Sequence, residues 1–235
     1  MAVTYANQAA FVAALAKLVP DMKGGYTEAD FIQEAVNRLS EDVPGYATAD
    51  VGDGSTYEWA LGTSPFASWV VGFSEAWPIQ VEQLNAAGAP YRPPAPFSGD
   101  APYFDERTSG GVPTLYLVFV TAPGSTAKAR IRFRIPWTIG VSTYTVPAAF
   151  HVAVVKLAAA LKCSALSTYY KQTIDPAGGS DIFDARQYAE SYASDAERFL
   201  AEYRAAVPPV SSSAGLAFGR VSTALPTIFP AWGGR

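Results

Sequence analysis

The sequence holds only one cysteine and one histidine in 235 residues, and this scarcity narrows the chemistry of the chain. A single cysteine, Cys163, excludes an internal disulfide framework. No phosphate-binding loop, dinucleotide fingerprint or zinc-ligand spacing occurs anywhere along the chain. We therefore expect a protein that is not an enzyme, with no catalytic residues, no cofactor and no bound metal.

The two scarce residues also stand in positions that do not favour catalysis. His151 and Cys163 belong to one apolar helical pattern, in which they lie about 18 Å apart at 1.5 Å per residue. A nucleophile and its base need hydrogen-bond contact, so these two cannot form such a pair within one chain. We expect a satisfied core or interface imidazole and a cysteine that fills apolar space. A glycosidase built from distant acids stays an alternative.

The sequence also lacks a long apolar run and a targeting segment. No run reaches the roughly 18 apolar residues that a membrane span needs. The first residues, MAVTYANQAAF, lack the basic-then-apolar layout of a signal peptide. Hydrophobic residues make up 49% and charged residues 16%, which is typical of a folded globular protein. These features favour an intracellular origin and no membrane partner.

Acidic residues are absent from Arg107 to Lys171, although the net charge of the chain is -4. From Glu28 to Glu106 the balance reverses, because acids dominate there. The basic stretch contains Arg107, Lys128, Arg130, Arg132, Arg134, Lys156, Lys162 and Lys171. The acidic and basic blocks pair either inside one subunit or between copies in a ring, where complementary charge fixes the register of docking.

The pattern of apolar residues predicts four helices. The first spans residues 6–18, and the second follows Thr27, an N-cap hydroxyl with carboxylates in the next turn. The third covers residues 147–172 and is apolar on nearly every side, as a helix buried by several neighbours is. The fourth spans residues 184–207 and ends at a Pro-Pro step.

Between the second and third helices the chain changes to glycine, proline, aromatic and β-branched residues. We therefore predict an α+β fold, a small helical bundle with a β-rich insertion and an extended C-terminal arm. The predicted parts are a bundle core over 1–44 and 146–207, an insertion over 45–145 and an arm over 208–235.

Within the insertion the clearest predicted hairpin is VPTLYLVFVTAPGSTAKARIRFRIPWTI, residues 112–139. Its second strand alternates strictly, so one face carries Ile131, Phe133 and Ile135 and the other carries Arg130, Arg132 and Arg134. We interpret the arginines as a solvated face, with an acidic neighbour or nucleic-acid phosphates as alternatives. We expect SWVVGFSEAWPIQVEQL to form one broken strand or two, and GAPYRPPAPFSGDAP to form a loop.

The last two predicted helices carry a family resemblance. A proline-started, alanine-rich helix ends in LKCSALSTYYKQ, and after a short break a second helix reads DARQYAESYASDAERFLAEYRAAV. This layout resembles the adaptor proteins, also called connector or neck proteins, of tailed bacteriophages, and YTEADFIQEAVNRLSEDVP fits their opening helix. The resemblance covers residues 20–45 and 147–207 and includes no catalytic motif. The large β insertion departs from the smallest members of the family.

The resemblance implies a structural virion protein of the neck, between capsid and tail, made in the host cytoplasm. It implies a homo-oligomeric ring of about twelve copies that matches the portal. The implied partners are the portal protein, a tail or stopper protein, and double-stranded DNA that passes through the lumen without sequence-specific binding. Alternatives are another tail or baseplate component, or a carbohydrate-binding or carbohydrate-cleaving module. The stacking surface of such a module would be Trp59, Trp69, Trp77, Tyr91 and Tyr103.

The C-terminal stretch has no acid after Val207, yet it is rich in large apolar residues. The resemblance implies an arm that packs against the portal or a neighbouring subunit; folding back on its own subunit is the alternative. Its predicted partner-binding residues are Leu216, Phe218, Arg220, Leu225, Ile228, Phe229, Trp232 and Arg235. The candidates for subunit contact are Arg130, Arg132 and Arg134.

Overall fold

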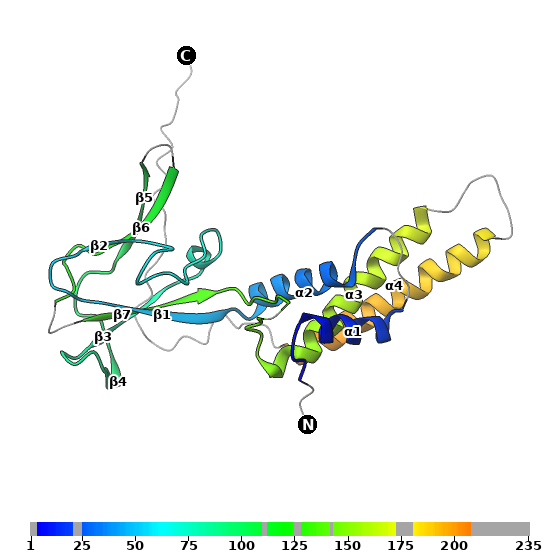
Figure 1. The fold of residues 1–235 in the computed structure, drawn as a ribbon, viewed down its shortest axis with the longest axis horizontal. Coiled ribbons are helices and arrows are strands. Elements are labelled where there is room, and N and C mark those ends of the chain that lie inside the picture. The colour runs from blue at the N-terminus through cyan, green and yellow to red at the C-terminus, as the bar shows by residue number, and fades with distance from the viewer. Residues whose placement is uncertain are drawn as a thin grey trace, which may run out of the picture. The chain divides into compact units, whose positions relative to one another are not determined.

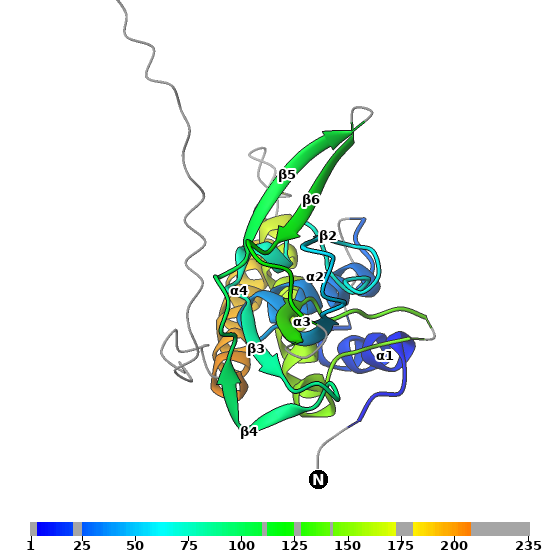
Figure 2. The same cartoon turned by 90° about the vertical axis from the view of Figure 1, so that its left-hand side faces the viewer.

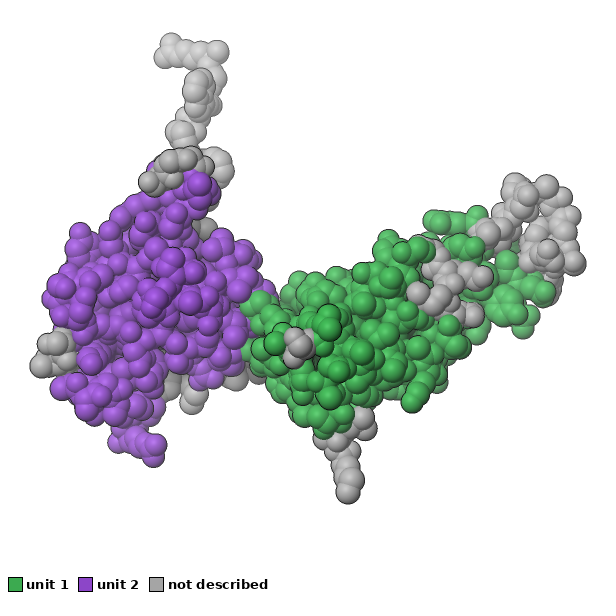
Figure 3. Space-filling model, viewed as in Figure 1, with its two compact units in different colours: residues 1–45, 136–214 green, residues 46–135, 215–235 purple. Residues whose placement is uncertain are grey.

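The computed structural model describes residues 4–20, 25–109, 112–124, 128–141, 143–172 and 181–207. Within them lie four α helices and seven β strands, with all of the strands between the second and third helices (Figure 1). The described residues divide into two compact units (Figure 3). The helical unit contains the described residues within 4–45 and 136–207, and the β unit contains the described residues within 46–135. The predicted α+β fold with its β-rich insertion is confirmed.

Local capping signals set the first two helices. Helix α1 spans Gln8–Leu18, and the side chain of its N-cap residue Asn7 accepts a hydrogen bond from the Ala10 N–H at 3.0 Å. Helix α2 spans Glu28–Asp42 and begins with a capping box. Its N-cap Thr27 accepts from the Asp30 N–H, and the Asp30 carboxylate accepts from the Thr27 N–H at 2.8 Å. The predicted N-cap at Thr27 is confirmed.

Helices α3 and α4 form the rest of the helical unit. A 3-10 turn, η2 at Ala148–Phe150, leads into α3, which spans His151–Gln172, and α4 spans Asp181–Ala206. Helix α3 contacts α1, α2 and α4. By length and hydropathy Ala148–Gln172 is long and apolar enough to cross a membrane, but 61% of its most apolar window is buried within the protein. Packing inside the helical unit thus accounts for the apolar composition that the sequence shows.

The core of the helical unit extends beyond the helices. Ile139 and Val146 are buried in it, and Trp137 and Tyr144 pack against it. The Trp137 indole N–H donates to the Val43 carbonyl at 2.6 Å, which ties this segment to the end of α2. The expected insertion over 45–145 is therefore too long, because the second boundary between the units lies at Ile135 and Pro136. Apolar contacts, which the local pattern does not specify, place this connection in the helical unit.

The β unit contains two sheets. The four-stranded sheet has the order β1 (Gly45–Val51), β7 (Ala129–Ile135), β3 (Gln80–Leu84) and β4 (Pro90–Pro96). The three-stranded sheet has the order β2 (Glu58–Ala60), β6 (Val112–Val118) and β5 (Tyr103–Ser109). Figure 2 shows β5 and β6 as a long ribbon that reaches beyond the short β2. The pairing of β2 with β6 ends at Ala60, which lies opposite Tyr116. Beyond that point the ribbon consists of β5 and β6 alone.

The predicted hairpin over 112–139 is wrong in its pairing, although both of its strands exist. β6 pairs antiparallel with β5 from Tyr103 opposite Val118 to Ser109 opposite Val112. β7 lies in the other sheet and pairs with β3, with Val81 opposite Ile131. β6 pairs with the strand that precedes it in the chain, β5, and not with β7. The two strands of the predicted hairpin therefore belong to different sheets.

Two further expectations in the insertion are corrected. The proline-rich stretch expected to be a loop contains β4, an edge strand of the four-stranded sheet. An edge position suits proline because the outer side of the strand needs no N–H donor. In SWVVGFSEAWPIQVEQL only Gln80–Leu84 is a strand, and Ser74–Ala76 forms a 3-10 turn, η1.

Aromatic rings fill the core of the β unit. Phe66 and Phe133 are fully or almost fully buried, with ring centroids 5.9 Å apart. Trp69 packs on Phe133 at 5.0 Å and on Phe104 at 5.5 Å. The alternation of β7 delivers Ile131 and Phe133 to this core, as predicted. The opposite face of β7 is left with its arginines.

Candidate interaction sites

The arginines of β7 fall on one face, as predicted, but they differ in their surroundings. Arg130 forms a bidentate pair with Asp50 of β1, with two N–O distances of 2.7 Å, and its guanidinium lies 3.8 Å from Glu82 of β3. The hydrogen bonds to Asp50 raise the pKa of Arg130, against the opposing effect of burial. The acidic neighbour that the sequence left as an alternative is therefore present for Arg130.

Arg132 and Arg134 instead lie over aromatic rings. The Arg132 guanidinium is 3.9 Å from the centroid of Tyr46. Arg134 lies 5.3 Å from the same ring and 4.4 Å from Trp77. Among the residues that the structure describes, neither arginine forms an ion pair, so their N–H groups keep their capacity for a carboxylate or phosphate. Sequence reasoning missed this arginine–aromatic face because Tyr46 and Trp77 come from distant segments.

Several ion pairs between the acidic and basic blocks form inside one chain. Arg107 pairs with Glu58 at 2.8 Å, in addition to the pair between Arg130 and Asp50. Two cations of α3 also pair, Lys156 with Glu202 at 2.6 Å and Lys162 with Glu28 at 2.9 Å. The intrasubunit alternative is therefore confirmed for Arg107, Arg130 and Lys162, whose partners lie in the acidic block, whereas the partner of Lys156 lies outside it. Of the three arginines proposed for subunit contact, Arg132 and Arg134 remain available.

Lys162 is a buried charge that the sequence analysis did not single out. Its side chain is 2% exposed, and its ammonium donates to the Val19 carbonyl at 2.7 Å and to Glu28 at 2.9 Å. Val19 is the C-cap residue of α1 and Glu28 is the first residue of α2, so one side chain of α3 connects its own helix to the ends of two others. Burial raises the pKa of Glu28, but the hydrogen bond from Lys162, a hydrogen bond from its own backbone N–H and the charge of Lys162 together outweigh burial and leave that pKa lowered. The signal in the sequence is a lysine within an otherwise apolar helix.

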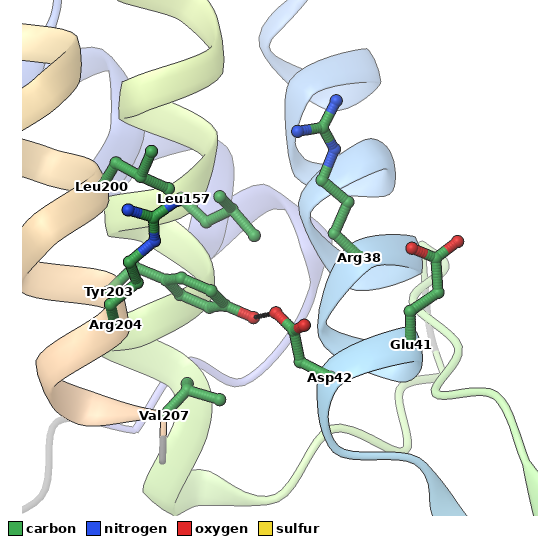
Figure 4. A pocket seen from close by; sticks show the side chains of 8 residues that line it. All are labelled: Arg38, Glu41, Asp42, Leu157, Leu200, Tyr203, Arg204 and Val207. Carbon is green, nitrogen blue, oxygen red and sulfur yellow. Dashed lines mark hydrogen bonds between the residues drawn. The ribbon is translucent and has the colours of Figure 1, made fainter. Parts of the chain in front are cut away.

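A groove opens between α2, α3 and α4, and Figure 4 shows the side chains that line it. Its volume is about 460 Å³, within the usual range for ligand sites. The lining residues of this helical groove are Arg38, Glu41, Asp42, Leu157, Leu200, Tyr203, Arg204 and Val207. Sequence reasoning did not find this groove, because its walls come from three helices that are distant in the chain.

The apolar and acidic side chains that line the helical groove come from different helices. Leu157, Leu200 and Val207 form an apolar wall from α3 and α4, while Glu41 and Asp42 stand on α2 (Figure 4). Tyr203 is almost fully buried, and its hydroxyl donates to the Asp42 carboxylate across the groove. Burial, and then this hydrogen bond, raise the pKa of Tyr203. The hydroxyl therefore stays protonated near neutral pH, which suits a binding wall better than a general base.

The two scarce residues lie where the sequence placed them. His151 is fully buried; its Nδ1 accepts from the Tyr5 N–H at 2.9 Å, and its Nε2 donates to the Val146 carbonyl at 3.1 Å. Both ring nitrogens thus have backbone partners. Cys163 is buried, and burial raises its pKa to about 11. Within the described ranges, no three His, Cys, Asp or Glu side chains gather in a group that could hold a metal ion.

The five aromatics proposed as a sugar-stacking surface do not form one. Trp69 is buried and Trp59 packs against the same core, while Trp77 lies under Arg134. Tyr91 and Tyr103 are exposed, but they belong to strands of different sheets. This arrangement speaks against the carbohydrate alternative, because sugar stacking needs rings exposed on a shared surface.

The predicted partner-binding residues of the arm lie outside the described residues and stay predictions. They are Leu216, Phe218, Arg220, Leu225, Ile228, Phe229, Trp232 and Arg235. Comparison of the chain with protein-family models gives no match, and comparison with curated proteins gives none.

Proposed function

We propose that this chain is a structural virion protein that forms a ring between the portal and the tail of a tailed bacteriophage. The ring serves as a conduit for DNA. The observation that carries the proposal is the helical unit, in which α2 is followed by a β insertion and then by the long helices α3 and α4. After α4 the chain continues into an apolar segment without acids. The order of the helices and the apolar C-terminal segment agree with the layout that the adaptor resemblance implies, whereas the large β insertion departs from the smallest members of the family.

Buried polar groups such as His151 and Lys162 are engaged in hydrogen bonds that hold helices together. The groups left for partners are the arginine–aromatic face, the helical groove and the C-terminal segment. All three are suited to contacts with protein surfaces.

Ring formation is tested by measuring the mass of the purified protein alone and in the presence of isolated portal rings. We expect a closed ring of about twelve copies, because heterologous contacts close when the rotation between subunits permits. Salt should weaken the ring only moderately, since four cations of the basic block already pair inside the chain. A protein that stays monomeric both alone and on portal rings contradicts the proposal.

The conduit role predicts weak binding to DNA. Each phosphate neutralised by a cation releases counterions, so a channel lined by many cations would grip DNA tightly. A net charge of -4 suits passage without retention. We expect no tight binding to random duplex DNA at physiological salt, and tight binding that weakens steeply with salt contradicts this part of the proposal.

The C-terminal segment is the proposed docking arm. Deleting residues 208–235 should leave the folded units nearly as stable as before while abolishing attachment to the portal or neighbouring subunit. Unfolding of the truncated protein would assign the segment to its own core. Attachment at full strength would move the anchors elsewhere, with the β unit as the next candidate. The position of the chain in an electron-microscopy map of the particle separates a neck ring from another tail or baseplate component.

A further inference from the structure

We infer that the helical groove receives the C-terminal segment, residues 208–235, of a second copy of this chain. This inference rests on the proposed ring and names the receptor that the proposed function leaves open. The groove supplies an apolar wall and an acidic edge (Figure 4). The segment supplies apolar and basic side chains and no carboxylate side chain.

The position at which the described chain ends is the first support. Val207, the last described residue, is itself part of the groove lining. The segment therefore leaves the helical unit at the edge of the groove. Its first two residues are Pro208 and Pro209, which fix φ and oppose an immediate reversal into the groove that the chain has just left. A segment from another copy meets no such constraint.

The reach of the segment is the second support. Residues 208–235 span up to about 90 Å when extended, at about 3.3 Å per residue. Helix α4 has 26 residues, and at 1.5 Å per residue it is about 39 Å long. The extended segment is therefore longer than α4, the longest helix of the described chain. This reach is sufficient for a groove on an adjacent subunit of a ring.

Charge and shape complementarity are the third support. Leu157, Leu200 and Val207 offer apolar contact to side chains such as Phe218 and Trp232. On the opposite side, Glu41 and Asp42 form the acidic edge, to which Arg220 and Arg235 are the complementary charges. The positive charge of Arg38 is already matched by Glu34 at 3.0 Å.

Arg204 is the remaining cation of the lining, and it stands on α4 rather than on α2 (Figure 4). Among the described residues it forms no ion pair with Glu41 or Asp42, so the acidic edge keeps its charge. The volume of about 460 Å³ admits only a few side chains, so each contact is weak. A ring of segments engaging a ring of grooves gains strength through avidity.

The binding experiment uses the full-length chain. The receptor carries Phe218→Ser, Phe229→Ser and Trp232→Ser, so that its own segment cannot compete; we call it the anchor variant. The probe is a fluorescently labelled peptide of residues 208–235. We expect saturable binding, followed by fluorescence anisotropy. Absence of binding to the anchor variant overturns the inference.

A groove substitution identifies the site. Adding Glu41→Lys and Leu200→Lys to the anchor variant should weaken peptide binding at least tenfold, because one change reverses the acidic edge and the other charges the apolar wall. Glu197→Lys is the matched control, since Glu197 is exposed on α4 and does not line the groove. If the variant with Leu200→Lys does not fold, Glu41→Lys alone, at an exposed position, should also weaken peptide binding. Equal binding by groove and control variants overturns the inference.

Complementation identifies the source of the segment. The anchor variant keeps an intact groove, and a full-length Glu41→Lys, Leu200→Lys variant keeps an intact segment. Neither should associate alone, whereas their mixture should form a one-to-one complex in sedimentation. A mixture that stays monomeric overturns the inference, because the segment then occupies its own groove or none. If wild type still assembles on portal rings in that case, the proposed function survives; failure of wild-type assembly rejects the function itself.

Discussion

At the scale of single residues, Lys162 shows how one charge can organise the helical unit. Moving an ammonium group from water into the protein interior costs free energy unless an opposite charge and hydrogen bonds compensate for the lost hydration. Here a carbonyl at the end of α1 and a carboxylate at the start of α2 do so. The position of the charge on α3 therefore fixes how two helix ends approach a third. Its two contacts hold helix ends together.

Removing the Lys162 side chain should be strongly destabilising. Breaking a buried ion pair leaves its partner uncompensated, so Lys162→Ala should cost about 3–5 kcal/mol of unfolding free energy. Lys162→Met keeps much of the volume and should cost less. Urea denaturation followed by circular dichroism measures both, with the exposed Lys17→Ala as a control. A cost for Lys162→Ala no greater than that of the control would contradict this role.

The Glu28 carboxylate predicts a pH dependence of stability. The pKa of Glu28 is lower in the folded chain than in the unfolded chain, as the net result of opposing burial and the contacts of Lys162. Its contribution is therefore fully present above the unfolded pKa and is lost as pH falls through the folded pKa. The difference in unfolding free energy between wild type and Glu28→Gln should shrink as the solution is acidified. A difference that is constant with pH would contradict the prediction.

At the scale of elements, the helices were predictable because their signals are local. The Thr27 cap and the proline after α2 lie beside the residues that they affect. The alternation of β7 is local too, and it correctly predicted which side chains enter the core. Strand pairing is not local. The sequence did not predict that β6 pairs with β5, or that the proline-rich stretch forms an edge strand.

The candidate sites follow the same division. Alternation placed Arg132 and Arg134 on one face, but the rings of Tyr46 and Trp77 reach them only through tertiary structure. The helical groove is lined by residues from three segments that are distant in the sequence, so no local sequence motif predicts it. The sequence therefore indicated the arginines but not their aromatic partners, and it did not indicate the lining of the groove.

The capping box of α2 should contribute measurably to stability. Thr27→Ala removes the acceptor for the Asp30 N–H and should cost about 1 kcal/mol of unfolding free energy. Thr27→Ser keeps the hydroxyl and should cost much less. Chemical denaturation measures the difference. Gln33→Ala, at an exposed position within the same helix, is the control, and equal costs for Thr27→Ala and Thr27→Ser would contradict the role of the cap.

The arginine–aromatic face of the four-stranded sheet predicts coupling between two side chains. Arg132 lies 3.9 Å from the Tyr46 ring centroid, and a partly exposed contact of this kind is worth about 0.5–1 kcal/mol. A double-mutant cycle with Arg132→Ala and Tyr46→Leu should recover this coupling in urea denaturation. The pair Arg132 and Tyr57 serves as the control, since Tyr57 is exposed elsewhere in the β unit. Strictly additive costs at Arg132 and Tyr46 would contradict the contact.

At the scale of the whole molecule, pairing of the charge blocks inside the chain changes how assembly should be understood. Arg107, Arg130, Lys156 and Lys162 stabilise the subunit itself. The proposed contacts between copies then depend on a smaller set of groups, the arginine–aromatic face and the apolar C-terminal segment. Avidity in a ring suits such weak individual contacts, because many act together.

The molecule also contains two separate hydrophobic cores, one in each unit. The helical core includes Leu39, and the β core includes Phe133. Within the described residues, each core cluster draws its members from one unit. Each unit therefore has its own source of stability, as independently folding domains do. A defect in one core should lower the stability of that unit first.

This separation predicts that each core substitution shifts a different transition. Phe133→Ala should cost about 3–5 kcal/mol and Leu39→Ala about 2–5 kcal/mol, because both side chains are buried. Helical circular dichroism reports the helical unit, whereas Trp59, Trp69 and Trp77 bias tryptophan fluorescence toward the β unit. Phe133→Ala should shift the fluorescence transition and leave the helical signal nearly in place, and Leu39→Ala should do the reverse. If either substitution moves both signals together by the same amount, the two cores unfold as one cooperative unit.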